Sequence, residues 1–446
     1  MKILLVNPPR SPHNGILDFA PEEARPFIHK KLIGPPLGLL TIASAARDHD
    51  VLLLDMKGEY DLDPDAADPE TLVGTYLKSF NPDMVGVTFI ASEFSQGIEI
   101  FRWAKRHDPR ILTVAGGLHA TACPADFNDG SVDLVIPGQC ADIFMNAVRA
   151  HEEGKNPGSA PGVYAKSEGG LVFSGRADRR WEAAGKDFIM PDRSHLRRWI
   201  SAYRAGGSPD PSTYIFTSLG CPYRCTFCSI WPLFDGRYHQ RDIESVIEEL
   251  KSMDEYPVVR FADANTIVNE DFINALFDRI AEEGIRKFFI MDIRFDTAVK
   301  YPGLIEKLAR NGLRVVICGF ESYREEELRR YRKEAPARLI EEAISIFHAN
   351  GIMVRGNYVI PADYTRDDFS AMADYAGSHR VVYAGYTILT PMPGTSFYES
   401  VRERIVDHDL SRYNFFNCVF RTVLPLEKFY ESVGRLWLIK EGTDVI

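Results

Sequence analysis

Short apolar runs alternate with segments of helical spacing along the first 150 residues. The runs predict five strands, at Lys2–Asn7, Val51–Asp55, Met84–Ile90, Ile111–Ala115 and Leu134–Ile136. Helices are predicted between them, at Gly38–Arg47, Leu72–Phe80 and Gly97–Arg106. Continuously apolar strands joined by helices are typical of a parallel sheet covered on both faces. The pattern therefore predicts an α/β, doubly wound domain over 1–150, with a ligand site at the carboxyl ends of its strands.

The alternation stops over 151–212, which we interpret as a connector. Its first part is rich in turn formers, and Val163–Ser174 is expected to form a hairpin with its turn at Gly169-Gly170. The alternation resumes with strands expected at Tyr214–Ser218, Val258–Phe261, Phe288–Asp292, Val315–Gly319, Met353–Val359 and Tyr383–Leu389. Helices between them include Ile243–Met253, Asp271–Glu282, Leu304–Asn311 and Pro336–Asn350. Six such repeats predict a partial (β/α)6 barrel over 213–400, followed by a mainly helical segment over 401–446.

Charge and composition narrow the function classes. The formal net charge is −11, which disfavours a nucleic-acid partner. Neither a signal peptide nor an apolar run long enough for a transmembrane segment is found, so we expect a cytoplasmic protein. The seven cysteines are an odd number in a long chain, and a disulfide framework is not expected.

Three of the cysteines, Cys221, Cys225 and Cys228, are spaced CxxxCxxC directly after the first predicted barrel strand. The loops that follow barrel strands are where barrel enzymes place their chemistry. Three thiolates in one loop can bind an iron–sulfur cluster and leave one iron open. A zinc site would need a fourth ligand, and His239 is the nearest candidate. The third interpretation is that these thiols bind no metal centre.

The segment Ser218–Ser229 resembles the signature loop of the radical S-adenosylmethionine (SAM) superfamily. The resemblance continues through Phe261–Asn265, Met291–Asp296, Gly319–Ser322, Gly356–Ile360 and Pro391–Thr395, although Pro361 stands where a second glycine is expected. It implies a [4Fe-4S] cluster on the three cysteines. It also implies SAM contacts, with Phe227 near the adenine, Asp263 accepting from the methionine ammonium, and Glu321 or Ser322 bonding the ribose. The remaining expected SAM contacts are Asn265, Arg294, Tyr358 and Pro391. For Asp263, Glu321 and Arg294, a helix cap or a structural ion pair is the competing interpretation.

What the resemblance implies is a radical mechanism. SAM chelates the open iron, one electron cleaves its sulfonium, and the resulting 5′-deoxyadenosyl radical abstracts a substrate hydrogen. The protein positions the cofactors and excludes water. An electron donor such as flavodoxin or ferredoxin is an expected partner, together with a small-molecule substrate, while the oligomeric state is not legible.

The segments Asn7–Pro9, Pro35–Leu39, Val85–Ser92 and Gly116–Thr121 occur in that order ahead of the cysteine motif. Together they resemble the Rossmann-like cobalamin-binding domain attached to one branch of this superfamily. That branch contains class B radical methyltransferases and the anaerobic magnesium-protoporphyrin ester cyclase. No Asp-x-His-x-x-Gly segment is present, so we expect cobalamin without a protein histidine on cobalt. The segment Pro137–Asp142 departs from the Gly-Glu-Gly-Glu usual there, and Cys140 within it has no assigned role. The expected cobalamin contacts are Asn7, Leu37, Thr88, Ser92, Gly116, Gly117, His119, Gly138 and Gln139.

The leading hypothesis is a cobalamin-dependent radical C-methyltransferase that acts on an unactivated carbon. Radical cyclisation, oxidation or rearrangement without methyl transfer is the alternative, and a cobalamin or iron–sulfur sensor is a third. Methylthiolation of tRNA is disfavoured, because Cys123 and Cys140 cannot supply the second cluster of that family. The many aromatic residues after Phe397 either close the barrel over a flat substrate or pack in the core.

Overall fold

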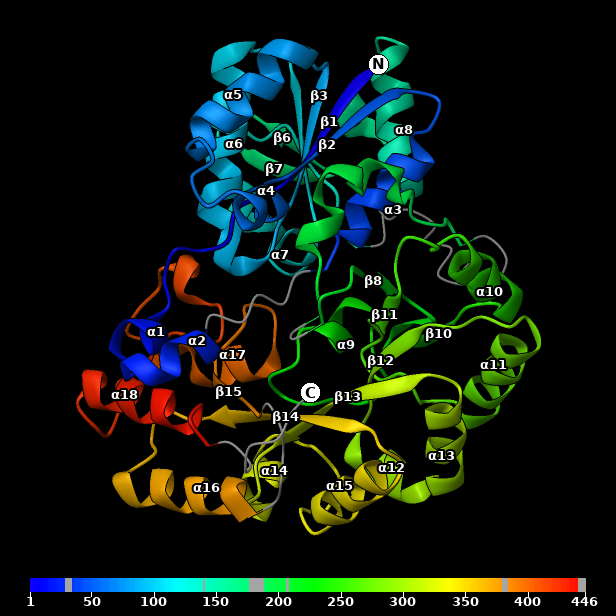
Figure 1. The fold of residues 1–446 in the computed structure, drawn as a ribbon. Coiled ribbons are helices and arrows are strands. Elements are labelled where there is room, and N and C mark those ends of the chain that lie inside the picture. Colours follow the sequence, from blue (N-terminus) through cyan, green and yellow to red (C-terminus); the bar gives the residue numbers. More distant parts are fainter. Residues whose placement is uncertain (29–33, 139–140, 176–187, 206–207, 379–383, 440–446) are drawn as a thin grey trace. The chain divides into compact units, whose positions relative to one another are not determined.

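The computed structural model describes residues 1–28, 34–138, 141–175, 188–205, 208–378 and 384–439 (Figure 1). They divide into two compact units. The first unit contains residues 1–12 and the described residues of 34–175 and 188–203. The second contains residues 13–28 and the described residues from 204 onward.

The first unit is built on a seven-stranded sheet of order β2-β1-β3-β4-β5-β6-β7. The five predicted strands are confirmed as parallel neighbours: β1 (Lys2–Asn7), β2 (Asp50–Asp55), β3 (Met84–Thr88), β4 (Leu112–Gly116) and β5 (Leu134–Val135). Their interior positions are buried because helices cover both faces. The strand order reverses between β1 and β3, and parallel sheets bind ligands at such a switch point.

The predicted hairpin extends this sheet. Strands β6 (Tyr164–Ser167) and β7 (Gly170–Phe173) pair antiparallel, and β6 pairs antiparallel with β5. Since Ser167 pairs with Gly170, the turn lies at residues 168–169, one residue before the predicted position. The segment that we interpreted as a connector thus supplies the last two strands of the first unit.

Helices flank the sheet on both sides. Figure 1 shows α5 (Pro69–Phe80) and α6 (Phe94–His107) along one face, with α3 (Leu37–Ala45) and α8 (Ala141–Glu152) along the other. Asp68 starts α5 by accepting hydrogen bonds from the backbone N–H groups of Glu70 and Thr71. Shorter elements lie at the strand ends: α4 (Met56–Leu62), η2 (Ala91–Glu93), α7 (Leu118–Ala122), η3 (Pro124–Phe127) and η6 (Arg193–Ala202).

The second unit contains the predicted partial barrel. Its six-stranded parallel sheet has the order β15-β14-β13-β12-β11-β8. The strands are β8 (Ser212–Ile215), β11 (Val258–Phe261), β12 (Phe288–Asp292), β13 (Leu313–Glu321), β14 (Met353–Ile360) and β15 (Gly385–Ile388). Consecutive strands are neighbours throughout, as βα repeats require. The six-strand barrel prediction is therefore confirmed.

Helices cover the outer face of this sheet (Figure 1). They are α10 (Ile243–Lys251), α11 (Glu270–Glu282), α12 (Phe295–Lys300), α13 (Pro302–Arg310), α14 (Glu325–Arg330), α15 (Leu339–Ala349) and α16 (Arg366–Ser378). A short antiparallel ribbon, β9 (Ser218–Gly220) with β10 (Tyr238–Gln240), was not predicted. Within the described residues, no helix has the length and apolarity that crossing a bilayer requires.

An N-terminal segment packs on the end of the chain. Helix α1 (Gly15–Phe19), which is followed by α2 (Arg25–Ile28), lies against α18 (Leu426–Leu436). The Phe19 ring stacks on Tyr430 at 5.7 Å. A Cβ at Gly15 would come within 2.5 Å of the Tyr430 ring, so only glycine permits this approach. Besides α18, the C-terminal segment contains α17 (Ser396–Val401) and short 3₁₀ turns, and most residues between 405 and 425 are irregular.

Candidate functional site

The cysteine motif lies in the second unit, between β9 and α9 (Ile230–Leu233). Gly220 leads into it with φ of +81°, and a Cβ there would stand 2.2 Å from the Arg237 carbonyl oxygen of the ribbon. The turn into Cys221 therefore requires glycine. Further along, the Thr226 N–H donates to the Tyr331 carbonyl at 3.1 Å, and the Thr226 carbonyl accepts from the Phe397 N–H at 2.9 Å. These bonds fix the loop at both the fourth and the sixth strand ends.

The three thiols are withdrawn from solvent. Cys221 and Cys225 are 8% and 9% exposed, and Cys228 is half-buried. Burial raises the pKa of each thiol, and mutual repulsion among the three sulfurs raises it further. The Ile230 N–H donates to Cys228 Sγ at 3.4 Å, and the Trp231 indole donates to the Cys225 carbonyl at 2.9 Å. The loop is thus preorganised around its sulfurs.

The distances between the three cysteine sulfurs bear on whether the loop would hold a cluster or a single metal ion. Among the described residues, the set of three metal-ligating side chains whose ligand atoms all lie within 4.8 Å of one another is elsewhere, in the first unit. A tetrahedral zinc ion with Zn–S bonds of about 2.3 Å would hold its sulfurs about 3.8 Å apart. Cys221, Cys225 and Cys228 are not such a set, so at least one pair of their sulfurs is more than 4.8 Å apart. A cluster accommodates such a separation, because each thiolate binds a different iron.

Two buried cations lie near the thiols. The Lys333 ammonium pairs with Glu321 Oε1 at 2.8 Å, and the Arg294 guanidinium donates to the Lys333 carbonyl at 2.8 Å. Burial opposes the charged form of Lys333, but the Glu321 and Cys225 charges outweigh it and the pKa of Lys333 is raised. Both cations favour ionised thiols in the loop. A thiolate-bound cluster is anionic, so their placement fits it.

Asp263, at the end of β11, supports the start of the cysteine loop. Its carboxylate accepts four hydrogen bonds, from the backbone N–H and the hydroxyl of both Thr217 and Ser218, at 2.7 to 3.0 Å. Burial raises the pKa of Asp263 to about 6, although these four donors favour the ionised form. In this arrangement the carboxylate positions the residues directly before Cys221.

Other predicted SAM contacts gather at the carboxyl ends of the barrel strands. Asn265 accepts from the Arg294 N–H at 3.4 Å, and Arg294 pairs with Asp296 and covers the Tyr223 ring at 3.9 Å. Glu321 has φ of +61° at the end of β13. Three of the set are buried or packed on a neighbour: Ser322, Pro391 and Phe227, whose ring meets Tyr331 edge-on.

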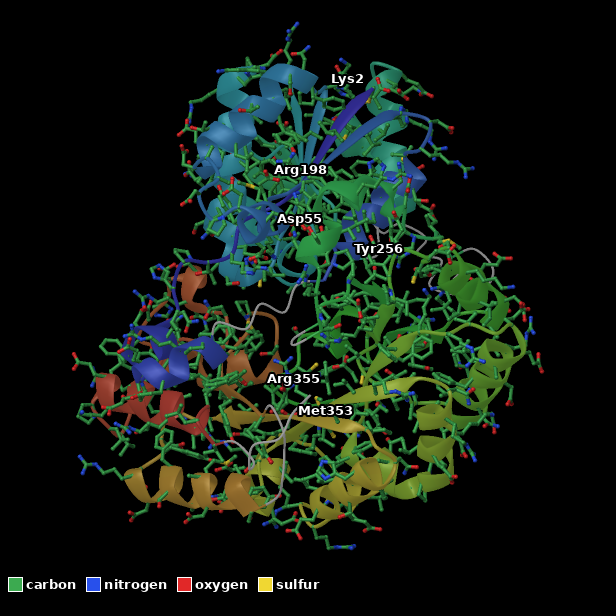
Figure 2. All side chains as sticks on the ribbon, viewed as in Figure 1. Lys2, Asp55, Arg198, Tyr256, Met353 and Arg355 are labelled. Atoms are coloured by element: carbon green, nitrogen blue, oxygen red, sulfur yellow. The ribbon has the colours of Figure 1, made fainter. Side chains whose placement is uncertain are left out.

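Tyr358 lies on the other face of its strand. Its ring stacks on Tyr386 at 5.6 Å and meets Tyr375 of α16 edge-on, between the sheet and the outer helices. Its hydroxyl has no hydrogen-bond partner among the described residues. The alternation of β14 instead turns Met353 and Arg355 to the inner face of the barrel (Figure 2).

Sequence reasoning missed a charged group inside the barrel. Arg260 on β11 forms a two-pronged ion pair with Asp292 on β12, with contacts of 2.8 to 3.0 Å. Arg355 on β14 lies close enough for Arg260 to depress its pKa further, beyond the effect of burial. Within the described part of the chain, the Arg355 guanidinium forms neither an ion pair nor a hydrogen bond. In β14 a signal was available, because Arg355 and Asn357 stand two residues apart, whereas Arg260 and Asp292 are each the single polar residue of an otherwise apolar run.

The predicted cobalamin contacts of the first unit gather at the carboxyl ends of its strands. Asn7 ends β1 and donates to Asp55 at 2.7 Å, Thr88 ends β3, and Gly116 ends β4. Gly138 follows β5, and its N–H donates to the Thr121 hydroxyl at 2.7 Å. Leu37, Ser92 and His119 are buried nearby in α3, η2 and α7. Gln139 and Cys140 lie outside the described residues.

The loop after β4 combines a sharp glycine turn with exposed apolar side chains. The backbone turns sharply at Gly117, where φ is +95° and a Cβ would stand 2.7 Å from the Phe89 nitrogen. Ile90 and Leu118 are 37% and 39% exposed at the ends of β3 and β4. Exposed apolar side chains at a switch point are what a corrin face would cover. The residues present therefore fit cobalamin.

Gly117→Ala is expected to unfold the first unit more easily and to lower its cobalamin content. The added Cβ meets both backbone atoms of Phe89 in a left-handed conformation, a loss of about 2 kcal/mol or more. The measurement is the urea midpoint together with bound cobalamin per chain. Gly74→Ala is the matched control, because that helical position has open space and alanine favours the helix. Equal midpoints for the two variants would contradict the argument.

A second network missed from the sequence joins η6 to the first sheet. Asp55 accepts from the Tyr203 hydroxyl at 2.6 Å. Glu59 accepts from the Trp199 indole at 2.8 Å and pairs with Arg198, which is labelled with Asp55 in Figure 2. The Arg198 and Trp199 donors hold the pKa of Glu59 below its ordinary value, against the effect of burial. This network fixes residues 193–203 beside the end of β2.

Comparison with known proteins gives two domain matches. Residues 215–376 match the model of the radical SAM superfamily, and residues 28–148 match that of the B12 binding domain. The chain is 24% identical to hopanoid C-3 methylase from Methylococcus capsulatus, over 89% of this chain and 74% of that protein. It is 28% identical to an uncharacterized methyltransferase of Pyrococcus horikoshii, over 90% and 83% of the two chains.

A solved structure shares this architecture. The radical SAM methyltransferase TsrM from Kitasatospora setae, with cobalamin and a [4Fe-4S] cluster bound, superposes with a TM-score of 0.71. It covers 99% of this chain and 91% of its own length at 18% identity, so the likeness is one of fold.

Proposed function

We infer that the chain belongs to the cobalamin-dependent branch of the radical SAM superfamily, and we propose that it transfers a methyl group to an unactivated carbon of a small molecule. The observation that carries this proposal is the cysteine loop: two buried thiols and one half-buried thiol, with at least one pair of sulfurs more than 4.8 Å apart, beside the buried cations Lys333 and Arg294. The B12-binding domain and the methyltransferase relatives support methyl transfer.

Each cofactor has residues that fit it. Cys221, Cys225 and Cys228 would hold the cluster, and the strand ends around Gly116 and Gly117 would hold cobalamin. When bound, the cluster and SAM supply the substrate radical, and cobalamin supplies the methyl group. The chain itself turns the loop at Gly220, neutralises charge with Lys333, and keeps water from the thiols by burial.

The barrel interior supports a polar small-molecule substrate. Barrel interiors are usually filled by branched apolar side chains. Here Arg260, Asp292 and Arg355 occupy that face, and Arg355 is available to an anionic group. The proposal includes an electron donor such as flavodoxin or ferredoxin. It also places the protein in the cytoplasm, where thiols stay reduced.

The test is anaerobic turnover of the full chain with reductant and SAM carrying a trideuterated methyl group. We expect 5′-deoxyadenosine, bound cobalamin carrying the labelled methyl group, and S-adenosylhomocysteine from its reloading. With substrate present, two SAM are expected per methyl transferred, and with unlabelled SAM a product heavier by about 14 mass units. Cleavage without methylated cobalamin would support cyclisation or rearrangement instead. Absence of SAM cleavage by the reconstituted protein would support a sensor.

A further inference from the structure

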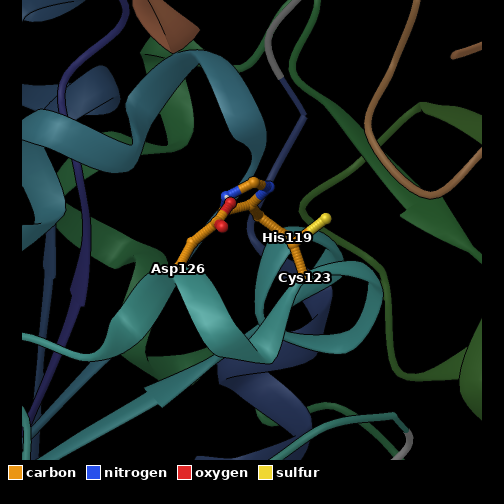
Figure 3. A group of neighbouring side chains, drawn as sticks. All are labelled: His119, Cys123 and Asp126. Atoms are coloured by element: carbon orange, nitrogen blue, oxygen red, sulfur yellow. Dashed lines mark ion pairs between the residues drawn. The ribbon is translucent and has the colours of Figure 1, made fainter. Parts of the chain in front are cut away.

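A second set of metal-ligating side chains lies in the first unit, in residues 119–126. His119 and Cys123 are four residues apart at the start and just past the end of α7, and Asp126 follows in η3. One ligand atom from each, an imidazole nitrogen, a thiol sulfur and a carboxylate oxygen, all lie within 4.8 Å of one another. Figure 3 shows the three side chains: in this view the Asp126 carboxylate lies at one edge of the His119 ring and the Cys123 sulfur beyond the other edge.

The packing around His119 fixes the direction of its ring. The side chain is 1% exposed, and its ring meets those of Phe94 and Phe127 at 5.2 and 5.8 Å. Its backbone N–H donates to the Phe89 carbonyl at 2.9 Å, which ties the residue to the end of β3. Asp126 and Cys123 are more accessible, at 43% exposed and half-buried. One side of the group is rigid and dry, while the other reaches solvent.

The contact between His119 and Asp126 is the second observation. His119 Nε2 lies 3.0 Å from Asp126 Oδ2, yet this buried nitrogen has no hydrogen-bond partner among the described residues. A buried imidazole nitrogen without a partner is costly. An imidazole nitrogen of His119 and a carboxylate oxygen of Asp126 are both atoms that a cation can bind, and with the Cys123 sulfur they lie within 4.8 Å of one another.

We propose that His119, Cys123 and Asp126 bind one divalent transition-metal ion, with Zn²⁺ the best match. Calcium and magnesium take oxygen ligands and do not use thiols, whereas zinc accepts nitrogen, sulfur and oxygen together. Zinc bonds of about 2.0 to 2.3 Å put the ligand atoms of a tetrahedral site roughly 3.3 to 3.7 Å apart, which small side-chain rotations inside the 4.8 Å set achieve. Three protein ligands leave the fourth position to water.

The ion would join α7 to η3. Both elements follow β4, and residue 119 is hydrogen-bonded to the end of β3, so the ion would stiffen the loop that carries Gly116 and Gly117. The His119 nitrogen would then serve zinc and not cobalt. This site does not depend on the radical reaction, because zinc content is measured without turnover.

The test is zinc content and zinc X-ray absorption of the anaerobically purified full chain, after dialysis against a weak chelator. We expect about one zinc per chain, with one sulfur at about 2.3 Å and the other ligands nitrogen or oxygen. Cys123→Ser and Asp126→Asn are expected to lower zinc content at least about fivefold. Asp126 is accessible, so its amide keeps the fold intact.

Cys418→Ser is the matched control, because that thiol is buried and belongs to neither proposed ligand set, and this variant should keep its zinc. Zinc bound by three sulfurs would mean that the ion sits in the cysteine loop, which would overturn this proposal and the cluster together. The metal site alone would be overturned if the unmodified chain held no more zinc than Cys123→Ser while still cleaving SAM. His119 and Asp126 would then form an ion pair only.

Discussion

Replacing Cys225 by serine is expected to abolish SAM cleavage. Cys225 is buried beside Lys333, and a serine hydroxyl there stays protonated and cannot replace a thiolate on iron. Iron should fall from about four atoms per chain toward zero. Production of 5′-deoxyadenosine should fall by roughly three orders of magnitude or more, because the cofactor and not the protein supplies the reactivity.

The measurements are iron and sulfide per chain, the visible absorption of the reconstituted protein, and 5′-deoxyadenosine by mass spectrometry. Cys418→Ser removes an equally buried thiol from an unrelated position, where it contacts the Phe420 carbonyl, and should leave all three readouts unchanged. Full iron content and activity in Cys225→Ser would refute the ligand assignment.

Asp263→Ala is expected to lower the free energy of unfolding of the second unit by about 3 kcal/mol or more. The substitution leaves four donors of Thr217 and Ser218 in the core without an acceptor, each costing about 1 kcal/mol or more. The loop before Cys221 loses its anchor, so cluster content should fall with stability. Urea denaturation and iron per chain measure the two effects.

Asp263→Asn separates support of the loop from contact with SAM. The amide keeps one acceptor oxygen, so stability and iron content should recover in part. If Asp263 also binds the methionine ammonium, the KM for SAM should rise well beyond the loss of iron. Asp68→Ala, which removes an exposed helix cap, is the control for a generic carboxylate loss of about 1 kcal/mol. A stability of Asp263→Ala equal to that of this control would contradict the structural role.

Two groups of charged side chains lie in the barrel, one near the cysteine loop and one on the inner face of the strands. Lys333 and Glu321 form a buried pair near the sulfurs, where Lys333 favours thiolates. Arg260, Asp292 and Arg355 lie deeper, on the inner face of the strands. Buried charges are retained only where they are paired or meet a ligand. Lys333 is paired with Glu321, whereas the Arg355 guanidinium has neither an ion pair nor a hydrogen bond among the described residues.

Sequence reasoning located the elements of both sheets because their signal is local. Strands β1, β11 and β12 lie where the apolar runs predicted them. A parallel strand that is buried on both faces has a mostly apolar sequence, so it is recognisable from a few consecutive residues. The cysteine spacing predicts a cluster loop for a similar reason, because the three cysteines occupy eight consecutive residues. The sequence specifies the position of a tight turn less well. In the hairpin, either Glu168-Gly169 or Gly169-Gly170 could form the two-residue turn, and the structure has the first pair.

Contacts between distant residues were beyond such reasoning. Nothing in residues 13–28 indicates that they pack on α18, and this contact is decided by Gly15 and Tyr430 meeting across some 400 residues. Half of the aromatic residues after Phe397 are buried packing residues, namely Tyr413, Phe420, Phe429 and Tyr430, whereas Phe415 is exposed. The role of Asp263 became clear only in the structure, where β11 places it beside Thr217. Likewise, the pairing of β14 with its neighbours showed which face of the sheet carries Tyr358.

The sequence by itself thus determined two α/β units in order, a loop with three closely spaced cysteines and a glycine turn after the fourth strand. These features depend on periodicity and on spacing within a few residues, and both can be seen in the amino-acid sequence. The tertiary structure alone decided which carboxylates are already engaged, which cations face the sulfurs, and that His119, Cys123 and Asp126 converge. Those outcomes depend on distances between side chains from different elements, and such distances exist only after packing.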